Sequence, residues 1–175
     1  ARVFERYEES KRENNALDFD DLLQKTEELF REHEEVRRRY QERYLYVLVD
    51  EFQDTNKAQY ELVHHLAGDR ENVFVVGDED QSIYSWRGAD YRNVLRFRSD
   101  FEDTTTCLLE QNYRSTETIL DAAQAVIDYN TQRTQKHLWT DNEEGEPIRL
   151  FEAYDEREEA EYVVSAIQKL VSRGR

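Results

Sequence analysis

Apolar side chains recur at helical spacing in several parts of the chain. Residues 1–43 are heavily charged, and within them the apolar positions of 17–30 fall mainly on one stripe of a helix. Asp18 is placed to cap the start of that helix. Further helices are predicted at 56–69, 115–130 and 156–174.

Short apolar runs between these segments predict strands. LYVLV (45–49), VFVV (73–76) and TTTCLL (104–109) are nearly continuous in apolar or β-branched residues, as expected of strands buried on both faces, and IRLFEAY (148–154) is a fourth candidate. Strands that alternate with helices imply parallel pairing in an α/β sheet. The pattern breaks near residue 98, which predicts one domain over 1–98 and another over 99–175.

Composition narrows the class of protein. The chain of 175 residues carries 40 acidic and 24 basic side chains, a formal net charge of −16, which argues against a surface that coats nucleic acid but leaves room for a local basic strip. No apolar run approaches the roughly 18 residues of a membrane span. A single cysteine, Cys107, fits a reducing compartment, so a cytoplasmic location without membrane contact is expected.

The first candidate site lies where the run LYVLV ends. Asp50 and Glu51 follow it directly, and open parallel sheets bind ligands beyond the carboxyl ends of their strands. One such carboxylate can hold Mg²⁺ through its water shell, while the other takes a proton from an attacking water. The alternative is a pair of solvated acids at a strand end.

The second candidate site follows the run VFVV. Gln81 can contact a phosphate oxygen or a water, and Tyr84, Trp86 and Arg87 supply planar groups that stack on unpaired bases. Residues 86–98 contain four Arg and one Asp, a net charge of +3 within an acidic chain, which favours a groove for a phosphodiester strand. The alternative is that the two aromatic residues belong to the core.

The third candidate site lies in LLEQNYRST (108–116). Arg114 can stabilise charge on a γ-phosphate, and Tyr113 can stack against a purine. Arg114 can equally form a local ion pair with Glu110 or Glu117.

Four segments together resemble the UvrD/PcrA/Rep type of superfamily-1 DNA helicases. They are DFDDLL (18–23), VLVDEFQDTN (47–56), VVGDEDQSIYSWRGAD (75–90) and LLEQNYRST (108–116), in the family's order and at similar spacing. The resemblance implies an α/β fold of the RecA-like, P-loop NTPase type, a parallel sheet with flanking helices. Residues 1–98 would form the C-terminal part of the first motor domain with an N-terminal helical segment, and 99–175 the N-terminal part of the second.

The resemblance also implies a function. It predicts a motor that couples Mg-ATP hydrolysis to 3′→5′ movement on single-stranded DNA, acts at duplex junctions and serves DNA repair or replication. Its cofactors would be ATP and Mg²⁺. The implied roles are Mg²⁺ binding for Asp50 and Glu51, with Glu51 also the general base, and coupling of the γ-phosphate to DNA for Gln81. DNA contact is implied for Tyr84, Trp86 and Arg87, adenine packing for Tyr113, and an arginine finger for Arg114.

One motif of the resembled family is missing. None of the five glycines is followed by Lys, so the phosphate-binding loop G-x-x-x-x-G-K-[ST] does not occur. Together with the lack of Met, this predicts a piece of a longer helicase that hydrolyses ATP negligibly by itself. Strands taken from a larger sheet leave unpaired edges, so dimerisation through those edges is expected.

Two other functions compete with the helicase. A two-metal nuclease would use converging carboxylates, for which Asp18, Asp20, Asp21, Asp50, Glu51 and Asp54 are candidates. Capping of a helix explains the first three more simply. A non-catalytic module whose acidic helices dock a basic partner is the second alternative.

Overall fold

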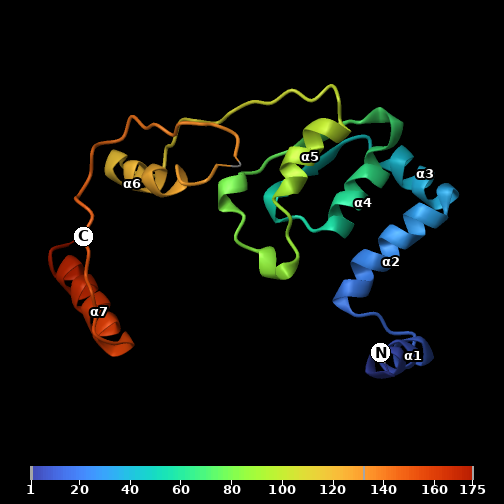
Figure 1. Cartoon of the computed structure of the whole chain (residues 1–175), viewed down its shortest axis with the longest axis horizontal. Helices are drawn as coiled ribbons and strands as arrows, with labels where there is room; N and C mark the ends of the chain where they lie inside the picture. The colour runs from blue at the N-terminus through green and yellow to red at the C-terminus, as the bar shows by residue number, and fades with distance from the viewer. Residues whose placement is uncertain (1, 132, 175) are drawn as a thin grey trace. The chain divides into compact units, whose positions relative to one another are not determined.

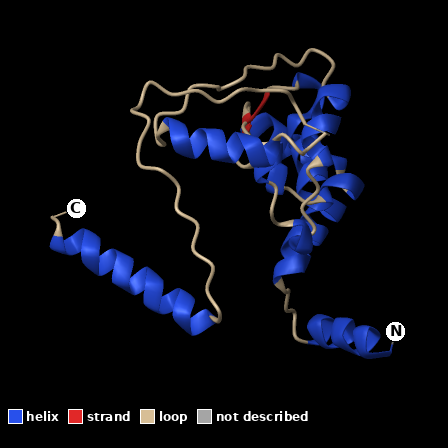
Figure 2. Cartoon of the chain, turned by 60° about the vertical axis from the view of Figure 1, so that its left-hand side comes forward, coloured by secondary structure: helices blue, strands red, loops and turns tan. Residues whose placement is uncertain are grey.

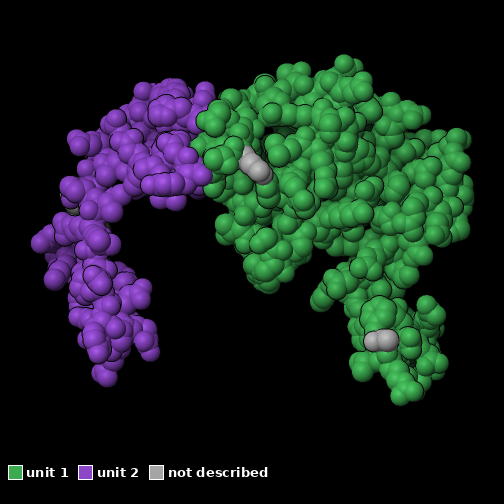
Figure 3. All heavy atoms as spheres, viewed as in Figure 1, with its two compact units in different colours: residues 1–108, 130–135 green, residues 109–129, 136–175 purple. Residues whose placement is uncertain are grey.

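The computed structural model describes residues 2–131 and 133–174, which divide into two compact units. Unit 1 comprises residues 1–108 and 130–135, and unit 2 comprises residues 109–129 and 136–175 (Figure 3). Residues 130–135 therefore belong to unit 1, although the segments on either side of them belong to unit 2.

The described residues of unit 1 form five α-helices, which Figure 1 labels along the chain. They are α1 (Arg2–Glu13), α2 (Phe19–Glu32), α3 (Glu34–Arg43), α4 (Lys57–Ala67) and α5 (Arg92–Asp100). The helices predicted at 17–30 and 56–69 are confirmed as α2 and α4. Both begin with a capping box, in which the side chain of Asp18 or Asn56 accepts a bond from the third helical N–H group.

Two parallel strands form the sheet of unit 1, shown red in Figure 2. β1 (Val47–Val49) pairs with β2 (Val73–Val75), and α4 connects them, as a parallel crossover requires. Because the strands run in the same direction, both carboxyl ends lie at one edge of the sheet. The predicted α/β class with parallel pairing is thus observed over these two strands.

The core of unit 1 lies against one face of this sheet. Phe52 is fully buried, and its ring packs 5.5 Å from that of Phe97 on α5 and 5.9 Å from that of Tyr60 on α4. The predicted burial of the strands on both faces is wrong, because Leu48 and Phe74 on the opposite face are 72% and 62% exposed. The helices cover only the face that carries the alternate valines.

A hydrogen bond ties α4 to α5 at the edge of the core. The Tyr60 hydroxyl donates to Asp100 Oδ2 at 2.6 Å. This bond lowers the pKa of Asp100, while burial and the neighbouring carboxylate raise the pKa of Tyr60. The two helices are therefore linked by a polar contact as well as by aromatic packing.

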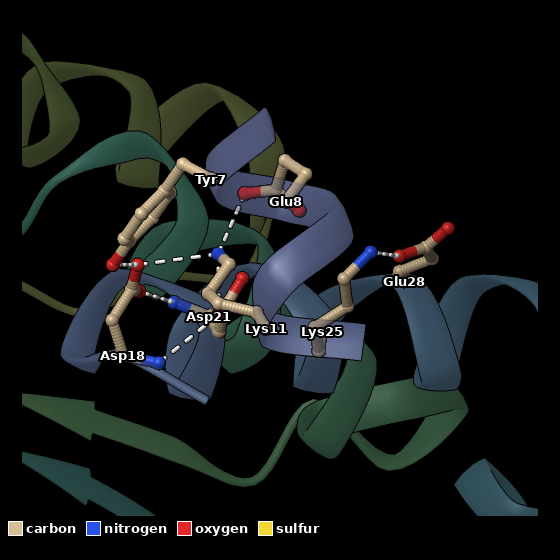
Figure 4. A network of polar contacts seen from close by, with 7 residues as sticks. All are labelled: Tyr7, Glu8, Lys11, Asp18, Asp21, Lys25 and Glu28. Carbon is tan, nitrogen blue, oxygen red and sulfur yellow. Dashed lines mark hydrogen bonds and ion pairs between the residues drawn. The ribbon is translucent and has the colours of Figure 1, made fainter. Parts of the chain in front are cut away.

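A cluster of charges joins α1 to the start of α2 (Figure 4). Lys11 Nζ lies 2.7 Å from Asp21 Oδ2 and 3.2 Å from Asp18 Oδ2, and the Tyr7 hydroxyl donates to Asp18 at 2.8 Å. The Asp21 backbone N–H, the Tyr7 hydroxyl and Lys11 together lower the pKa of Asp18 to about 2. Asp18 and Asp21, three positions apart in the sequence, thus stabilise the start of α2 and its contact with α1.

Unit 2 contains α6 (Glu117–Ile127) and α7 (Glu156–Ser172), close to the predicted helices. Its backbone is further held by an isolated parallel bridge between Gln111 and Trp139. The predictions of strands at 104–109 and 148–154 are wrong, because neither segment pairs with another strand in the part of the chain that the structure describes. A strand needs a partner for its backbone groups, and an apolar run cannot reveal whether one is present.

Within the described part of the chain, no helix combines the length and apolar character needed to cross a membrane.

Candidate functional site

The first part of the site is the turn that follows β1. Asp50 and Glu51 are both exposed, and the Asp50 carboxylate accepts the Glu51 N–H at 2.9 Å. The backbone of Glu51 is left-handed, with φ of 50°, a conformation that non-glycine residues adopt at a cost and that recurs at functional sites. The turn thus presents two carboxylates beyond the strand end.

The second part is the loop that follows β2. Asp78 caps a short 3-10 turn, Glu79–Gln81, by accepting the Asp80 N–H at 3.1 Å. The exposed Gln81 donates its Nε2–H to Asp78 Oδ2 at 2.8 Å. Since β1 and β2 are parallel neighbours, this loop lies at the same sheet edge as Asp50 and Glu51.

Gln53 connects the two loops and was not predicted as a site residue. Its side chain is 1% exposed, donates to Glu51 Oε2 at 2.8 Å and accepts the Asp78 N–H at 3.0 Å. In the sequence it stands out only as an amide between two acids after a strand. Its contact with Asp78 spans 25 residues, which local patterns do not reveal.

The third part is an exposed aromatic and cationic platform, formed by Tyr84, Trp86 and Arg87. The Arg87 guanidinium lies 4.6 Å from the Trp86 ring centre and 5.1 Å from that of Tyr84. Trp86 is 73% exposed, so the alternative that it belongs to the core is wrong. A stacked guanidinium and indole open to solvent are the groups that bind unpaired bases.

The platform is anchored to the turn after β1 through buried polar groups. The Asp90 N–H donates to the Thr55 carbonyl at 3.1 Å, and the fully buried Asn93 side chain donates to the same carbonyl at 2.9 Å. Asn93 was missed from the sequence, because its partner lies 38 residues away.

The predicted basic strip of residues 86–98 is partly neutralised within itself. Asp90 lies 2.7 Å from Arg92 and 3.5 Å from Arg96, and the hydrogen bond from Arg92 lowers the pKa of Asp90. Two of the four arginines therefore share one carboxylate, and the cationic charge at the platform itself comes from Arg87.

An ion pair and two hydrogen bonds also hold the loop after β2. Arg133 Nε lies 3.0 Å from Asp80 Oδ2, and both side chains are almost fully buried. Alongside, the Thr134 N–H donates to Glu79 at 2.6 Å and the Asn130 amide donates to Asp80 at 3.3 Å. Asn130, Arg133 and Thr134 thus contact the loop that carries Gln81, and the contact from Asp80 to Arg133 spans 53 positions, which no sequence pattern signals.

Tyr113 and Arg114 lie in unit 2. Tyr113 is 79% exposed, and its hydroxyl donates to Gln111 at 2.6 Å. The Asn112 carboxamide accepts the N–H groups of Arg114 and Ser115, which fixes the turn before α6. Among the described residues, Arg114 forms no ion pair with Glu110 or Glu117, the local alternative considered from sequence.

The acidic residues do not form the converging cluster that a two-metal nuclease needs. Within residues 2–131 and 133–174, no group of three or more His, Cys, Asp or Glu side chains is arranged to hold a metal ion. Asp18 and Asp21 are occupied in the capping box and by Lys11 (Figure 4).

Comparison with known proteins accounts for the whole chain. Residues 1–102 match the UvrD/REP helicase N-terminal domain and residues 107–175 match the UvrD-like helicase C-terminal domain. The chain is 51% identical over its full length to the ATP-dependent DNA helicase PcrA of Staphylococcus aureus, covering 24% of that protein.

The PcrA of Staphylococcus epidermidis is 52% identical over 97% of the chain and 23% of its own length. The chain thus spans about a quarter of the length of the curated relatives that it matches. These matches support neither the nuclease nor the acidic docking module. The chain belongs to the UvrD/REP family of DNA helicases.

Proposed function

We propose that this chain is part of an ATP-dependent 3′→5′ DNA helicase, with residues 1–98 in the first RecA-like motor domain and 99–175 in the second. The observation that carries the proposal is the shared edge of β1 and β2. There, two exposed carboxylates and an exposed amide stand on adjacent loops, and an aromatic platform follows on the same unit.

The carboxylates suit a nucleotide bound with Mg²⁺. This ion is usually held by one or two protein carboxylates together with waters and phosphate oxygens, so Asp50 with Glu51 beside it is a sufficient donor set. When bound, Mg²⁺ neutralises charge on the phosphates. Glu51 then accepts the proton of the attacking water, and Gln81 contacts the γ-phosphate.

The platform suits single-stranded DNA. Stacking on Trp86 and Arg87 tolerates any base, as a translocating motor requires. Gln81 and the platform are separated by only a few residues of one loop, so a change at the phosphate can reach the DNA site directly. Duplex junctions are the proposed partners of the complete motor.

Two residues of unit 2 are also assigned roles toward the nucleotide in this proposal. Tyr113 would pack on adenine, and Arg114 would stabilise the charge that develops on the γ-phosphate. The turn fixed by Asn112 supports this assignment, because it leaves both side chains exposed.

The DNA-binding half of the proposal is testable on the chain itself. Since Trp86 and Trp139 are the two tryptophans, the variant Trp139→Phe makes fluorescence report on Trp86 alone. Titration with oligo(dT) is expected to quench this signal, with an affinity that falls steeply as salt rises. An unchanged signal at low salt would contradict DNA binding at the platform.

A test of the catalytic part of the proposal requires a protein with the phosphate-binding loop, which this sequence lacks. A suitable protein is a chimeric motor, in which this chain replaces the matching segment of Staphylococcus aureus PcrA. We expect the chimeric motor to hydrolyse ATP and Glu51→Gln to abolish turnover, whereas the isolated 175-residue chain should hydrolyse ATP negligibly. Turnover by the isolated chain that Glu51→Gln abolishes would refute the prediction that this chain alone is inactive, and undiminished turnover of the chimeric motor in Glu51→Gln would refute the role of Glu51.

The remaining parts of the proposal concern the cellular setting. By analogy with its bacterial relatives, we place the protein in the cytoplasm, with a role in DNA repair or replication. The free edges of β1 and β2 suggest that the isolated chain dimerises, which sedimentation of the chain at several concentrations would test.

A further inference from the structure

Gln53 is one of three fully buried large side chains in the described part of unit 1, and it is polar. It occupies the space between the turn after β1 and the loop after β2. Burying an amide is unfavourable unless both of its ends are hydrogen-bonded. Here the Nε2–H group donates to Glu51 and Oε1 accepts from Asp78, so both ends are satisfied.

The two bonds require an amide specifically. A carboxylate at position 53 would still accept the Asp78 N–H but has no proton to donate to Glu51. A hydrocarbon side chain would form neither of the two hydrogen bonds. Gly77 closes the space from the other side, since a Cβ at that position would lie 3.0 Å from Gln53 Oε1 and 3.3 Å from its backbone nitrogen.

Glu51 depends on this contact for its orientation. Its side chain is exposed and its backbone is in the left-handed region. Among the described residues, Gln53 is the group that hydrogen-bonds the Glu51 carboxylate. Without it, the carboxylate would be free to adopt several rotamers in solvent.

We propose that Gln53 is a positioning residue that fixes the Glu51 carboxylate relative to the Asp78–Gln81 loop. The inference rests on the proposed function, in which Glu51 is the general base and Gln81 contacts the γ-phosphate. One buried amide then fixes the position of the general base relative to the loop that contacts the phosphate, so that a shift of either loop is transmitted to the other.

The test compares single and double variants of the chimeric motor. Gln53→Glu preserves size and the bond from Asp78 but removes the donor to Glu51. Because small misplacements of a reacting group can reduce rates by about 100-fold, we expect kcat to fall by that order with the KM for ATP little changed. The double variant Glu51→Gln/Gln53→Glu should be as inactive as Glu51→Gln alone, and it supplies the background rate against which the single variant Gln53→Glu is measured.

The matched control is Gln59→Glu, the same chemical change on α4. Gln59 Oε1 accepts the Asn56 N–H in a capping box, a role that Glu fills equally well, so kcat should be unchanged. Amide hydrogen exchange in the isolated chain gives a second readout. The Asp78 N–H should stay protected in Gln53→Glu and lose protection in Gln53→Ala.

The outcomes separate this inference from the proposed function. If the unmodified chimeric motor fails to hydrolyse ATP while the parent PcrA is active, the proposed function is contradicted. If the motor is active and Gln53→Glu retains its kcat within threefold, Gln53 does not position the base. A rise in the KM for ATP as large as the expected fall in kcat, with kcat itself unchanged, would also overturn the inference. Such a result would indicate a role in nucleotide binding alone.

Discussion

The buried ion pair between Asp80 and Arg133 makes a sharp prediction about the loop that carries Gln81. The change is Asp80→Asn, which keeps the size of the side chain and an oxygen for the Asn130 amide but removes the charge that faces Arg133. The Arg133 side chain is 2% exposed and that of Asp80 is 7% exposed. The variant therefore removes the Asp80 charge from beside a buried guanidinium.

The magnitude follows from this burial. Breaking a buried pair by removing one partner typically costs about 3–5 kcal/mol. If segment 130–135 opens locally, that cost corresponds to a roughly 100- to 5,000-fold larger open population, limited by the stability of unit 1.

Trypsin measures this opening directly, because it cleaves after Arg133. In the regime where opening is fast relative to cleavage, the rate follows the open population. Mass spectrometry of the chain should show cleavage after Arg133 accelerated at least about 100-fold in Asp80→Asn. The control Asp69→Asn changes an exposed acid and should leave the rate unaltered. A rate in Asp80→Asn within threefold of the control would refute the role assigned to the pair.

Three further predictions concern the platform, the core and the α1–α2 contact. Trp86→Ala should weaken binding of a labelled oligo(dT) by roughly 5- to 150-fold, since base stacking contributes about 1–3 kcal/mol, whereas Trp139→Phe should not; equal affinities would argue against stacking on Trp86. Phe52→Ala should lower the free energy of unfolding by about 3–5 kcal/mol in urea, while Phe19→Ala, at an 87% exposed position, should change it by less than about 0.5 kcal/mol; similar losses would contradict the observed core. The pKa of Asp18 is lowered to about 2 from an ordinary 3.8, so its contribution to stability is complete above that ordinary value and is lost as the pH falls toward 2. Protection of the α1 amides, corrected for the pH dependence of intrinsic exchange, should fall over this pH range in the wild type and much less in Asp18→Asn, with Asp20→Asn as the control; an unaltered pH response in Asp18→Asn would count against this linkage.

Features set by neighbouring residues were predictable from the sequence. The capping box at Asp18 depends on positions three apart, and the helices follow from the spacing of apolar side chains. The common edge for Asp50 and Gln81 follows from the rule that parallel strands present their carboxyl ends together. Their catalytic roles stay predictions until turnover is measured.

Features set by distant residues were not predictable. The strand at 104–109 was expected from its apolar composition, but a strand exists only where another segment offers its backbone groups. Gln53 and Arg133 reach partners far along the chain, and a buried amide or guanidinium has no sequence signature that separates it from an exposed one. These long-range polar contacts are what hold the two loops of the candidate site together.

Hydrolysis of ATP by the chimeric motor, measured with and without single-stranded DNA, tests the central claim most directly. The account predicts DNA-stimulated turnover that Glu51→Gln eliminates while Trp86→Ala mainly diminishes the stimulation by DNA. Undiminished turnover in Glu51→Gln would show that the chemistry does not take place at the shared edge of β1 and β2, and stimulation by DNA that survives Trp86→Ala intact would show that DNA does not act through the platform.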